Sequence, residues 1–284
     1  TSRFGNADSA GGATYIGTTL ATPQRLAGEE GKVDTVSVRA DEGVTPEQLV
    51  EDSESIGQLE SDGSVEKVAR SQAYGMRFPV QQHKLDVVLI NAPPGDFAAG
   101  DRGLASLPGR EHEFAASVVT ALRYAQALEC PRIHVMSGLL PEGADDEERG
   151  RRMRTYKRNL RFACQEAAEQ KVTILIEPIN PRDMPRYLLT TQAEAHAIRE
   201  ELGMANLRVQ MDLYHAQIVE GDLTTKIRHW LPHIGHFQVA GVPARNEPNI
   251  GEVNYDFLFK LLDELKYDGW IGCEYRPAQT TTAG

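Results

Sequence analysis

From about residue 84 onward, short apolar runs alternate with longer amphipathic stretches along the chain. The short runs are rich in β-branched residues and almost continuously hydrophobic, as strands buried on both faces are. We expect six strands, at Leu85–Asn91, Arg132–Gly138, Val172–Glu177, Leu207–Asp212, Gly235–Ala240 and Trp270–Tyr275. Helices are expected between them, near residues 111–129, 147–170, 191–203, 222–231 and 254–266. This alternation predicts parallel strands joined by crossover helices.

The first 83 residues leave room for two more strand and helix units. The candidate strands are Thr14–Leu20 and Val33–Ala40, and residues 45–59 and 64–82 are the candidate helices. We therefore expect a βαβα arrangement there and one α/β domain over residues 1–284, folded as a (β/α)8 TIM barrel. A length of 284 residues is ordinary for that fold.

Charge and cysteine content narrow the range of partners and compartments. The formal net charge is −11, which repels phosphate backbones, so we expect no nucleic-acid partner. The longest apolar runs, such as residues 87–90, are too short to cross a bilayer, and we expect neither a membrane association nor a signal peptide. Three widely spaced cysteines without a CxxC pair fit a reduced, cytoplasmic compartment. This composition allows a homo-oligomer without indicating one.

Each of the last four predicted strands ends on a side chain that carries oxygen, namely Glu177, Asp212, Gln238 and Glu274. The C-terminal ends of barrel strands meet at one mouth, where active sites form. A single carboxylate at a strand end is often a helix cap or an ion-pair partner, so the inference rests on all four. Such acceptors gathered without a cation would be unfavourable. Oxygen ligands suit Mg²⁺ or Mn²⁺ better than Zn²⁺, and we expect one such ion.

A cation at this mouth suggests a particular chemistry. An α-hydroxycarbonyl compound bound to the metal has a polarised carbonyl and a stabilised enediolate. Glu177 and Glu274 lie on the fifth and eighth strands, so they can flank such a substrate and act as its acid and base. Each can also bind the metal, because a carboxylate has two oxygens. The expected partner is a small hydroxy acid, keto acid or sugar.

Three further side chains are candidates for contact with this substrate. His215 follows the sixth strand on the mouth loop and can donate to a substrate oxygen or ligate the metal, with a structural role as the alternative. His134 lies within a strand, where packing is the simpler interpretation. Arg245, in the loop after the seventh strand, suits the carboxylate of a keto acid, and a surface ion pair with Glu247 is the alternative.

Several motifs, in order along the chain, give it a resemblance to the hydroxypyruvate isomerase family. They are Asn91-Ala-Pro-Pro-Gly95-Asp96, His134-Val-Met-Ser-Gly138, Glu177-Pro-Ile-Asn-Pro181, Asp212-Leu-Tyr-His215-Ala-Gln217, Gln238-Val-Ala-Gly241 and Gly272-Cys-Glu274-Tyr. The resemblance runs from about residue 84 to 277. Residues 1–83 match the family poorly, and the Val-Glu-Phe strand usual near the family's N-terminus is not found there.

The resemblance implies a xylose isomerase-like barrel that interconverts hydroxypyruvate and tartronate semialdehyde, or performs a related reaction on 2-oxo-tetronates. It also implies that Glu177, Asp212, Gln238 and Glu274 bind the metal and that the two glutamates are the acid and base. Asn91, in the first motif, is expected to contact the substrate together with His134, His215 and Arg245.

Other functions remain as alternatives. A ketose 3-epimerase would use the same scaffold, but such enzymes commonly carry a histidine at the third ligand position, where this chain has Gln238. A nuclease on a related barrel would need several histidine ligands for a metal cluster. A non-catalytic sugar-acid-binding barrel would be expected to have lost one of the two glutamates, and both Glu177 and Glu274 are present.

Overall fold

A curled sheet of parallel strands forms the centre of the protein. In the computed structural model, the described residues are 15–19, 35–39 and 86–278. Six parallel strands follow one another in chain order: β3 (Asp86–Asn91), β4 (Arg132–His134), β5 (Thr173–Ile176), β6 (Leu207–Asp212), β7 (Ile234–Val239) and β8 (Ile271–Cys273). All six fall on the predicted runs, although β4 and β8 are shorter than expected.

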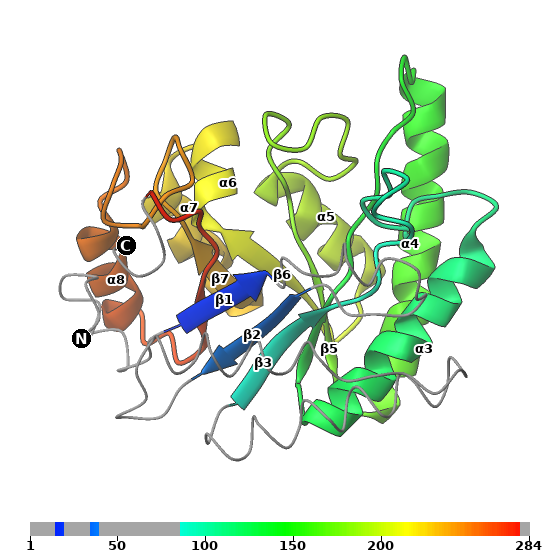
Figure 1. The fold of residues 1–284 in the computed structure, drawn as a ribbon, viewed down its shortest axis with the longest axis horizontal. Helices are drawn as coiled ribbons and strands as arrows, with labels where there is room; N and C mark the ends of the chain where they lie inside the picture. Colours follow the sequence, from blue (N-terminus) through cyan, green and yellow to red (C-terminus); the bar gives the residue numbers. More distant parts are fainter. Residues whose placement is uncertain (1–14, 20–34, 40–85, 279–284) are drawn as a thin grey trace.

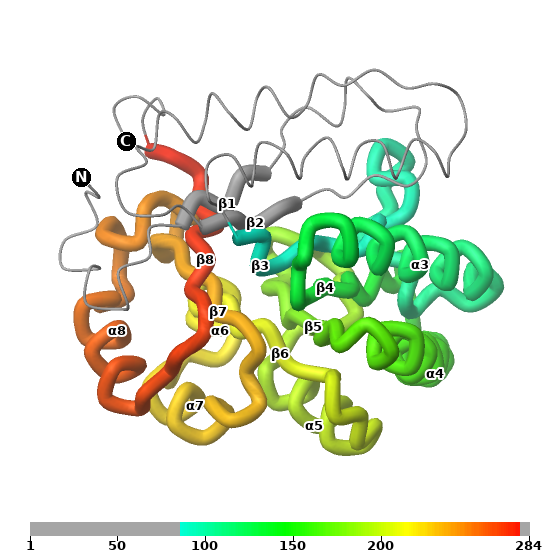
Figure 2. Tube along the Cα trace, turned by 90° about the horizontal axis from the view of Figure 1, so that it is seen from below, coloured from blue at the N-terminus to red at the C-terminus, as the bar shows by residue number. Residues whose placement is uncertain are grey.

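Helices cover the outside of these strands, in succession around the sheet (Figure 2). They are α3 (Glu111–Leu128), α4 (Asp146–Glu169), α5 (Gln192–Leu202), α6 (Leu213–Val219), α7 (Leu223–Trp230), which continues into the 3-10 turn η3 (Leu231–His233), and α8 (Tyr255–Glu264). The five predicted helices are confirmed. Helix α6 was not expected, because a helix of only seven residues is too short to show an amphipathic pattern in the sequence. Within the described residues, each helix is too short or too polar to span a bilayer.

The first two strands differ from the expected βαβα arrangement. Strands β1 (Tyr15–Thr19) and β2 (Thr35–Arg39) lie where the sequence predicts strands (Figure 1). However, β1 pairs antiparallel with β2, and β2 pairs antiparallel with β3, so the expectation of parallel units was wrong there. β-Branched residues predict where a strand forms but carry no information on its direction. The expected helices at 45–59 and 64–82 lie outside the described residues.

Apolar spacing and capping residues explain the helices that pack against the sheet. Helix α3 buries Phe114, Val118 and Ala121 at intervals of three and four residues, which turns one face toward the core. Asp145 caps α4 by accepting a hydrogen bond from the backbone of Glu148 at 2.9 Å. These features explain which face of α3 packs on the core and where α4 begins.

Arg132 braces the strands at the end opposite the mouth. It opens β4, and its Nε donates to the carbonyl of Gly235 in β7 at 3.0 Å. Its Nη1 donates to the carbonyl of Val88 in β3 at 3.2 Å. One guanidinium therefore ties together three strands that are distant in the sequence.

We predict that Arg132→Met lowers the free energy of unfolding by about 3 kcal/mol, because two backbone carbonyls lose a charged donor. Denaturant titration measures this change. Arg151→Met is the matched control, since Arg151 forms an exposed ion pair with Glu148 on α4. It should change stability by less than about 1 kcal/mol. Equal effects of the two substitutions would contradict the bracing role of Arg132.

Candidate active site

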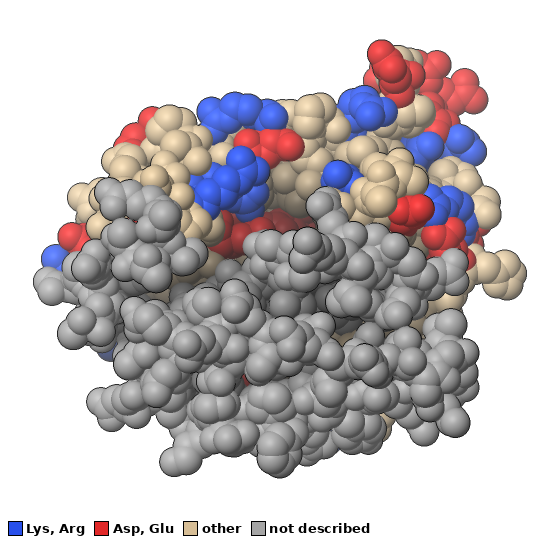
Figure 3. All heavy atoms as spheres, in the orientation of Figure 1, with Lys and Arg blue, Asp and Glu red and all other residues tan. Residues whose placement is uncertain are grey.

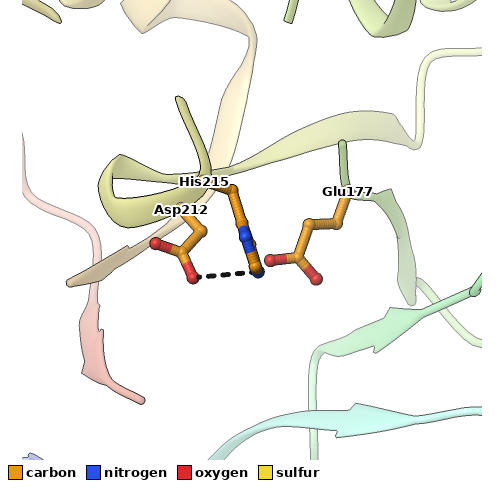
Figure 4. Close-up of side chains that lie close together, drawn as sticks. All are labelled: Glu177, Asp212 and His215. Carbon is orange, nitrogen blue, oxygen red and sulfur yellow. Dashed lines mark ion pairs between the residues drawn. The ribbon is translucent and has the colours of Figure 1, made fainter. Parts of the chain in front are cut away.

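Two buried carboxylates with unpartnered oxygens mark the mouth of the barrel. Glu177 directly follows β5 and is 4% exposed, and Asp212 ends β6 and is fully buried. Asp212 Oδ1 caps α6 by accepting a hydrogen bond from the Tyr214 backbone at 2.7 Å. Among the described residues, no group forms a hydrogen bond with Glu177 Oε1 or with Asp212 Oδ2. Figure 4 shows both carboxylates turned toward the same space, with His215 between them.

The surroundings of these two groups disfavour their charged forms. Burial, followed by repulsion from Glu274 and Asp212, raises the pKa of Glu177 well above its ordinary value. Burial likewise raises the pKa of Asp212, although the nearby guanidinium of Arg245 opposes that shift. Carboxylates in such surroundings are suited to bind a cation, because a positive charge would favour their ionised forms.

The other two oxygen-bearing side chains lie beside this pair. Gln238, on β7, donates from Nε2 to Oε2 of Glu274 at 2.8 Å. Its Oε1 accepts from Nε2 of Gln210, on β6, at 2.6 Å. Glu274 directly follows β8 and is the most exposed of the four. The structure thus brings the four predicted side chains together from four neighbouring strands.

Arg245 enters the site from the loop after β7. The loop closes through hydrogen bonds from the backbone N–H of Gly241 to Asn246 and of Arg245 to Gly241, both 2.7 Å long. Its guanidinium lies 3.1 Å from Oε1 of Glu274 and 4.0 Å from Oδ2 of Asp212. Burial alone lowers the pKa of Arg245, but these carboxylates raise it overall. Glu247 instead accepts hydrogen bonds from the Ala278 backbone, so the surface ion pair is not what the structure shows.

Asn91 and His134 form a second pair next to Glu177. His134 Nδ1 lies 3.1 Å from the amide oxygen of Asn91, and its Nε2 lies 3.6 Å from Oε2 of Glu177. Burial lowers the pKa of His134 to about 3, so the ring is neutral. With the proton on Nδ1, the Nε2 lone pair faces the Glu177 carboxyl. His134 is therefore buried, as packing requires, and also contacts the site.

His215 lies in the first turn of α6 and not on a loop, because Asp212 starts that helix. Its Nδ1 is 2.6 Å from Nδ2 of Asn180, and its Nε2 is 3.7 Å from Oδ2 of Asp212. Burial, and then the charge of Arg245, lower the pKa of His215 to about 3. The ring is neutral, and its Nε2 edge faces the carboxylates of Asp212 and Glu177.

Four residues that contact this site were not assigned from the sequence: Asn180, Asp183, Gln210 and Tyr214. Gln210 could have been found, because it stands two residues before Asp212 and strand side chains alternate with period two. Asn180 lies in one of the family-like motifs, but its partner is 35 residues away in the sequence. Asp183 accepts a hydrogen bond from the Tyr214 hydroxyl at 2.8 Å and lies 3.8 Å from Arg245.

This fold and this arrangement of side chains define the class of protein. The family model for the xylose isomerase-like TIM barrel matches residues 69–283. The chain is 54% identical over 209 residues to a 2-oxo-tetronate isomerase from Cupriavidus necator, covering 74% of this chain and 79% of that relative. It is 43% identical over 209 residues to hydroxypyruvate isomerase from Escherichia coli, covering 74% and 80%.

A solved structure shows the same fold at high identity. The crystal structure titled AP endonuclease, family 2, from Brucella melitensis matches with a TM-score of 0.71 and 45% identity, over 75% of this chain and 81% of that one. Taken together, the comparisons show that the chain belongs to the hydroxypyruvate isomerase family. It is therefore an enzyme of the isomerase class.

We predict that Glu177→Gln stabilises the protein in the presence of a chelator, by at least about 1 kcal/mol at pH 7. The folded-state pKa of Glu177 is raised, so ionisation opposes folding. The stability of the wild type should therefore fall, relative to the variant, as pH rises above the unfolded value of about 4.3. Glu264→Gln, on the exposed face of α8, is the control and should have little effect.

Denaturant midpoints measured from pH 4 to pH 8 test this directly. A Glu177→Gln variant that is less stable than the wild type at every pH would show that Glu177 has a stabilising partner in the metal-free protein.

Proposed function

We propose that the protein interconverts hydroxypyruvate and tartronate semialdehyde by proton transfer, with one Mg²⁺ or Mn²⁺ ion at the barrel mouth. The observation that carries this proposal is the pair of buried, unpartnered oxygens on Glu177 and Asp212, beside Gln238 and Glu274. One relative is named hydroxypyruvate isomerase, and both names denote isomerases, which supports a reaction of this type.

The donor set fits a hard divalent cation. Three carboxylates and one amide come from β5 to β8, and two of their oxygens are buried without a partner. Oxygen ligands of this kind suit Mg²⁺ and Mn²⁺. Glu177, Asp212, Gln238 and Glu274 would hold the ion. When bound, the ion supplies Lewis-acid polarisation of the substrate carbonyl.

The two glutamates supply the proton transfer. Conversion of hydroxypyruvate to tartronate semialdehyde removes a proton from C3 and adds one to C2, through an enediolate. Glu177 and Glu274 extend from β5 and β8, on either side of Asp212 and Gln238. Their environments differ. Glu274 contacts a guanidinium and an amide N–H, whereas Glu177 Oε1 has no hydrogen-bond partner in the described part of the chain. Two carboxyl groups in unlike environments suit the separate roles of base and acid.

Arg245 suits the carboxylate of the substrate. Its side chain is largely buried beside Glu274 and Asp212, and it stacks over the ring of Tyr214 at 5.2 Å. A guanidinium held in this way presents a planar set of donors to an incoming carboxylate. His134, Asn91 and His215 lie around the same space and provide further polar contacts.

A longer substrate, a 2-oxo-tetronate, is the second candidate, because the relative from Cupriavidus necator at 54% identity bears that name. It would use the same carboxylate and α-hydroxycarbonyl group. A nuclease function is less consistent with the site, since among the described residues the group of potential metal ligands within 4.8 Å of one another contains a single histidine, His215, beside Glu177 and Asp212. The described part of the face in Figure 3 mixes basic and acidic side chains and shows no continuous basic track.

We predict that Glu177→Gln and Glu274→Gln each lower kcat by at least about 100-fold, the usual scale of general acid–base catalysis. The assay supplies chelator-stripped protein with Mn²⁺ and hydroxypyruvate in deuterated water, and product analysis measures both turnover and deuterium on the product carbon. The wild type should incorporate solvent deuterium. Glu264→Gln, an exposed glutamate of α8, should behave like the wild type.

Two results would contradict this part of the proposal. The first is turnover that leaves no deuterium on the product carbon. The proton delivered to that carbon would then not come from a group that exchanges with solvent, as the proposed acid does. The absence of turnover by folded, Mn²⁺-loaded wild type on hydroxypyruvate, with turnover of a 2-oxo-tetronate, would assign the longer substrate.

We predict that Arg245→Met raises the KM for hydroxypyruvate at least about 10-fold, because one charge-assisted contact to the substrate carboxylate is lost. Steady-state kinetics measure this effect. Arg228→Met is the control, since Arg228 lies on the outer helix α7 and only approaches Glu264, at 3.8 Å. An unchanged KM in Arg245→Met would place the substrate carboxylate elsewhere.

A further inference from the structure

His215 occupies a position from which it could either ligate a cation or donate to a substrate. Glu177, Asp212 and His215 each offer one atom within 4.8 Å of the others (Figure 4). Distance alone would therefore make His215 the third ligand. The choice depends on which ring nitrogen carries the proton, because a ligating nitrogen needs a free lone pair.

The hydrogen bonds of His215 identify the protonated nitrogen. Nδ1 lies 2.6 Å from the side-chain Nδ2 of Asn180 and 3.4 Å from the backbone nitrogen of the same residue. Both of these groups are N–H donors, so Nδ1 must accept. The proton of the neutral ring then lies on Nε2, the nitrogen that faces the carboxylates.

The orientation of the Asn180 amide is itself fixed. Asn180 is fully buried, and its Oδ1 accepts a hydrogen bond from the backbone N–H of Asp183 at 2.8 Å. Exchanging the amide oxygen and nitrogen would set two donors against each other at that contact. The backbone N–H of Asn180 cannot be exchanged in any case. Two independent groups of one residue therefore specify the same tautomer.

We propose that Asn180 is a positioning residue that holds His215 with its proton on Nε2, so that His215 donates to a substrate oxygen and does not ligate the cation. The Nε2 atom is 3.7 Å from Oδ2 of Asp212, which is too long for a hydrogen bond and leaves the N–H available. The substrate contact rests on the proposed isomerase function, whereas the tautomer does not.

Asn180→Asp is the decisive substitution. The shape is kept, and one carboxylate oxygen can still accept from the Asp183 backbone. The second oxygen replaces the N–H donor with an acceptor, which favours the proton on Nδ1 of His215. Nitrogen-15 NMR of histidine in the metal-free protein reads the tautomer, and His215→Gln identifies the His215 signals. We expect protonated Nε2 in the wild type and protonated Nδ1 in Asn180→Asp.

Kinetics supply the second readout. Asn180→Asp should lower kcat by about 100-fold, the scale for loss of one preorganised donor, with KM within about threefold of the wild type. Asn254→Asp is the matched control, because Asn254 caps α8 through its Oδ1 and Asp caps equally well. It should leave the tautomer and kcat unchanged.

A Mn²⁺ titration keeps the proposal testable if Asn180→Asp does not fold. His215→Gln should bind Mn²⁺ within about threefold of the wild type, because His215 is not a ligand. A loss of Mn²⁺ affinity of 10-fold or more, or a wild-type ring protonated on Nδ1, would overturn the proposal. The NMR and Mn²⁺ measurements need no substrate, so a failure of the proposed function on hydroxypyruvate would not be mistaken for a failure of this inference.

Discussion

Two buried carboxylates close to each other are the constraint on which the mouth of this barrel depends. Glu177 and Asp212 are buried, and each has one oxygen without a hydrogen-bond partner among the described residues. One carboxylate oxygen of each residue lies within 4.8 Å of the other and of a ring nitrogen of His215. Like charges at such a separation repel by several kcal/mol, even with partial screening. A fold keeps such an arrangement where a cation offsets it. In the proposed function, the neighbouring side chains complete one cation site and form one substrate site around it.

The surrounding groups hold the first layer of side chains in place. Gln210 fixes the amide of Gln238, and the Arg245 loop closes on itself and places its guanidinium beside Glu274. Asn180 orients His215 from the loop after β5. Each support comes from a different strand or loop, so the geometry of the site depends on the order of the strands in the sheet.

The sequence was informative wherever function follows from position along a strand. The alternation of apolar runs with amphipathic stretches located the strands, and the residue at each strand end was then enough to predict Glu177, Asp212, Gln238 and Glu274. Parallel strands present their last residues at one edge of the sheet. Contacts that depend on side-chain direction were not accessible, such as the pairing of Asn180 with His215 across 35 residues. The sequence also left open whether Arg245 pairs with Glu247 or enters the site. The hydrogen bonds that close its loop place the guanidinium beside Glu274. The sequence pattern also could not predict the antiparallel direction of β1 and β2. An apolar run favours a strand without indicating how that strand pairs with its neighbours.

The most direct test of this account is a crystal structure of the protein grown with Mn²⁺, with anomalous scattering used to locate the ion. The account predicts one Mn²⁺ at the barrel mouth, bound by oxygens of Glu177, Asp212, Gln238 and Glu274. An empty mouth in the presence of saturating Mn²⁺, with Glu177 and Asp212 still side by side, would contradict the claim that these carboxylates are kept together for a cation.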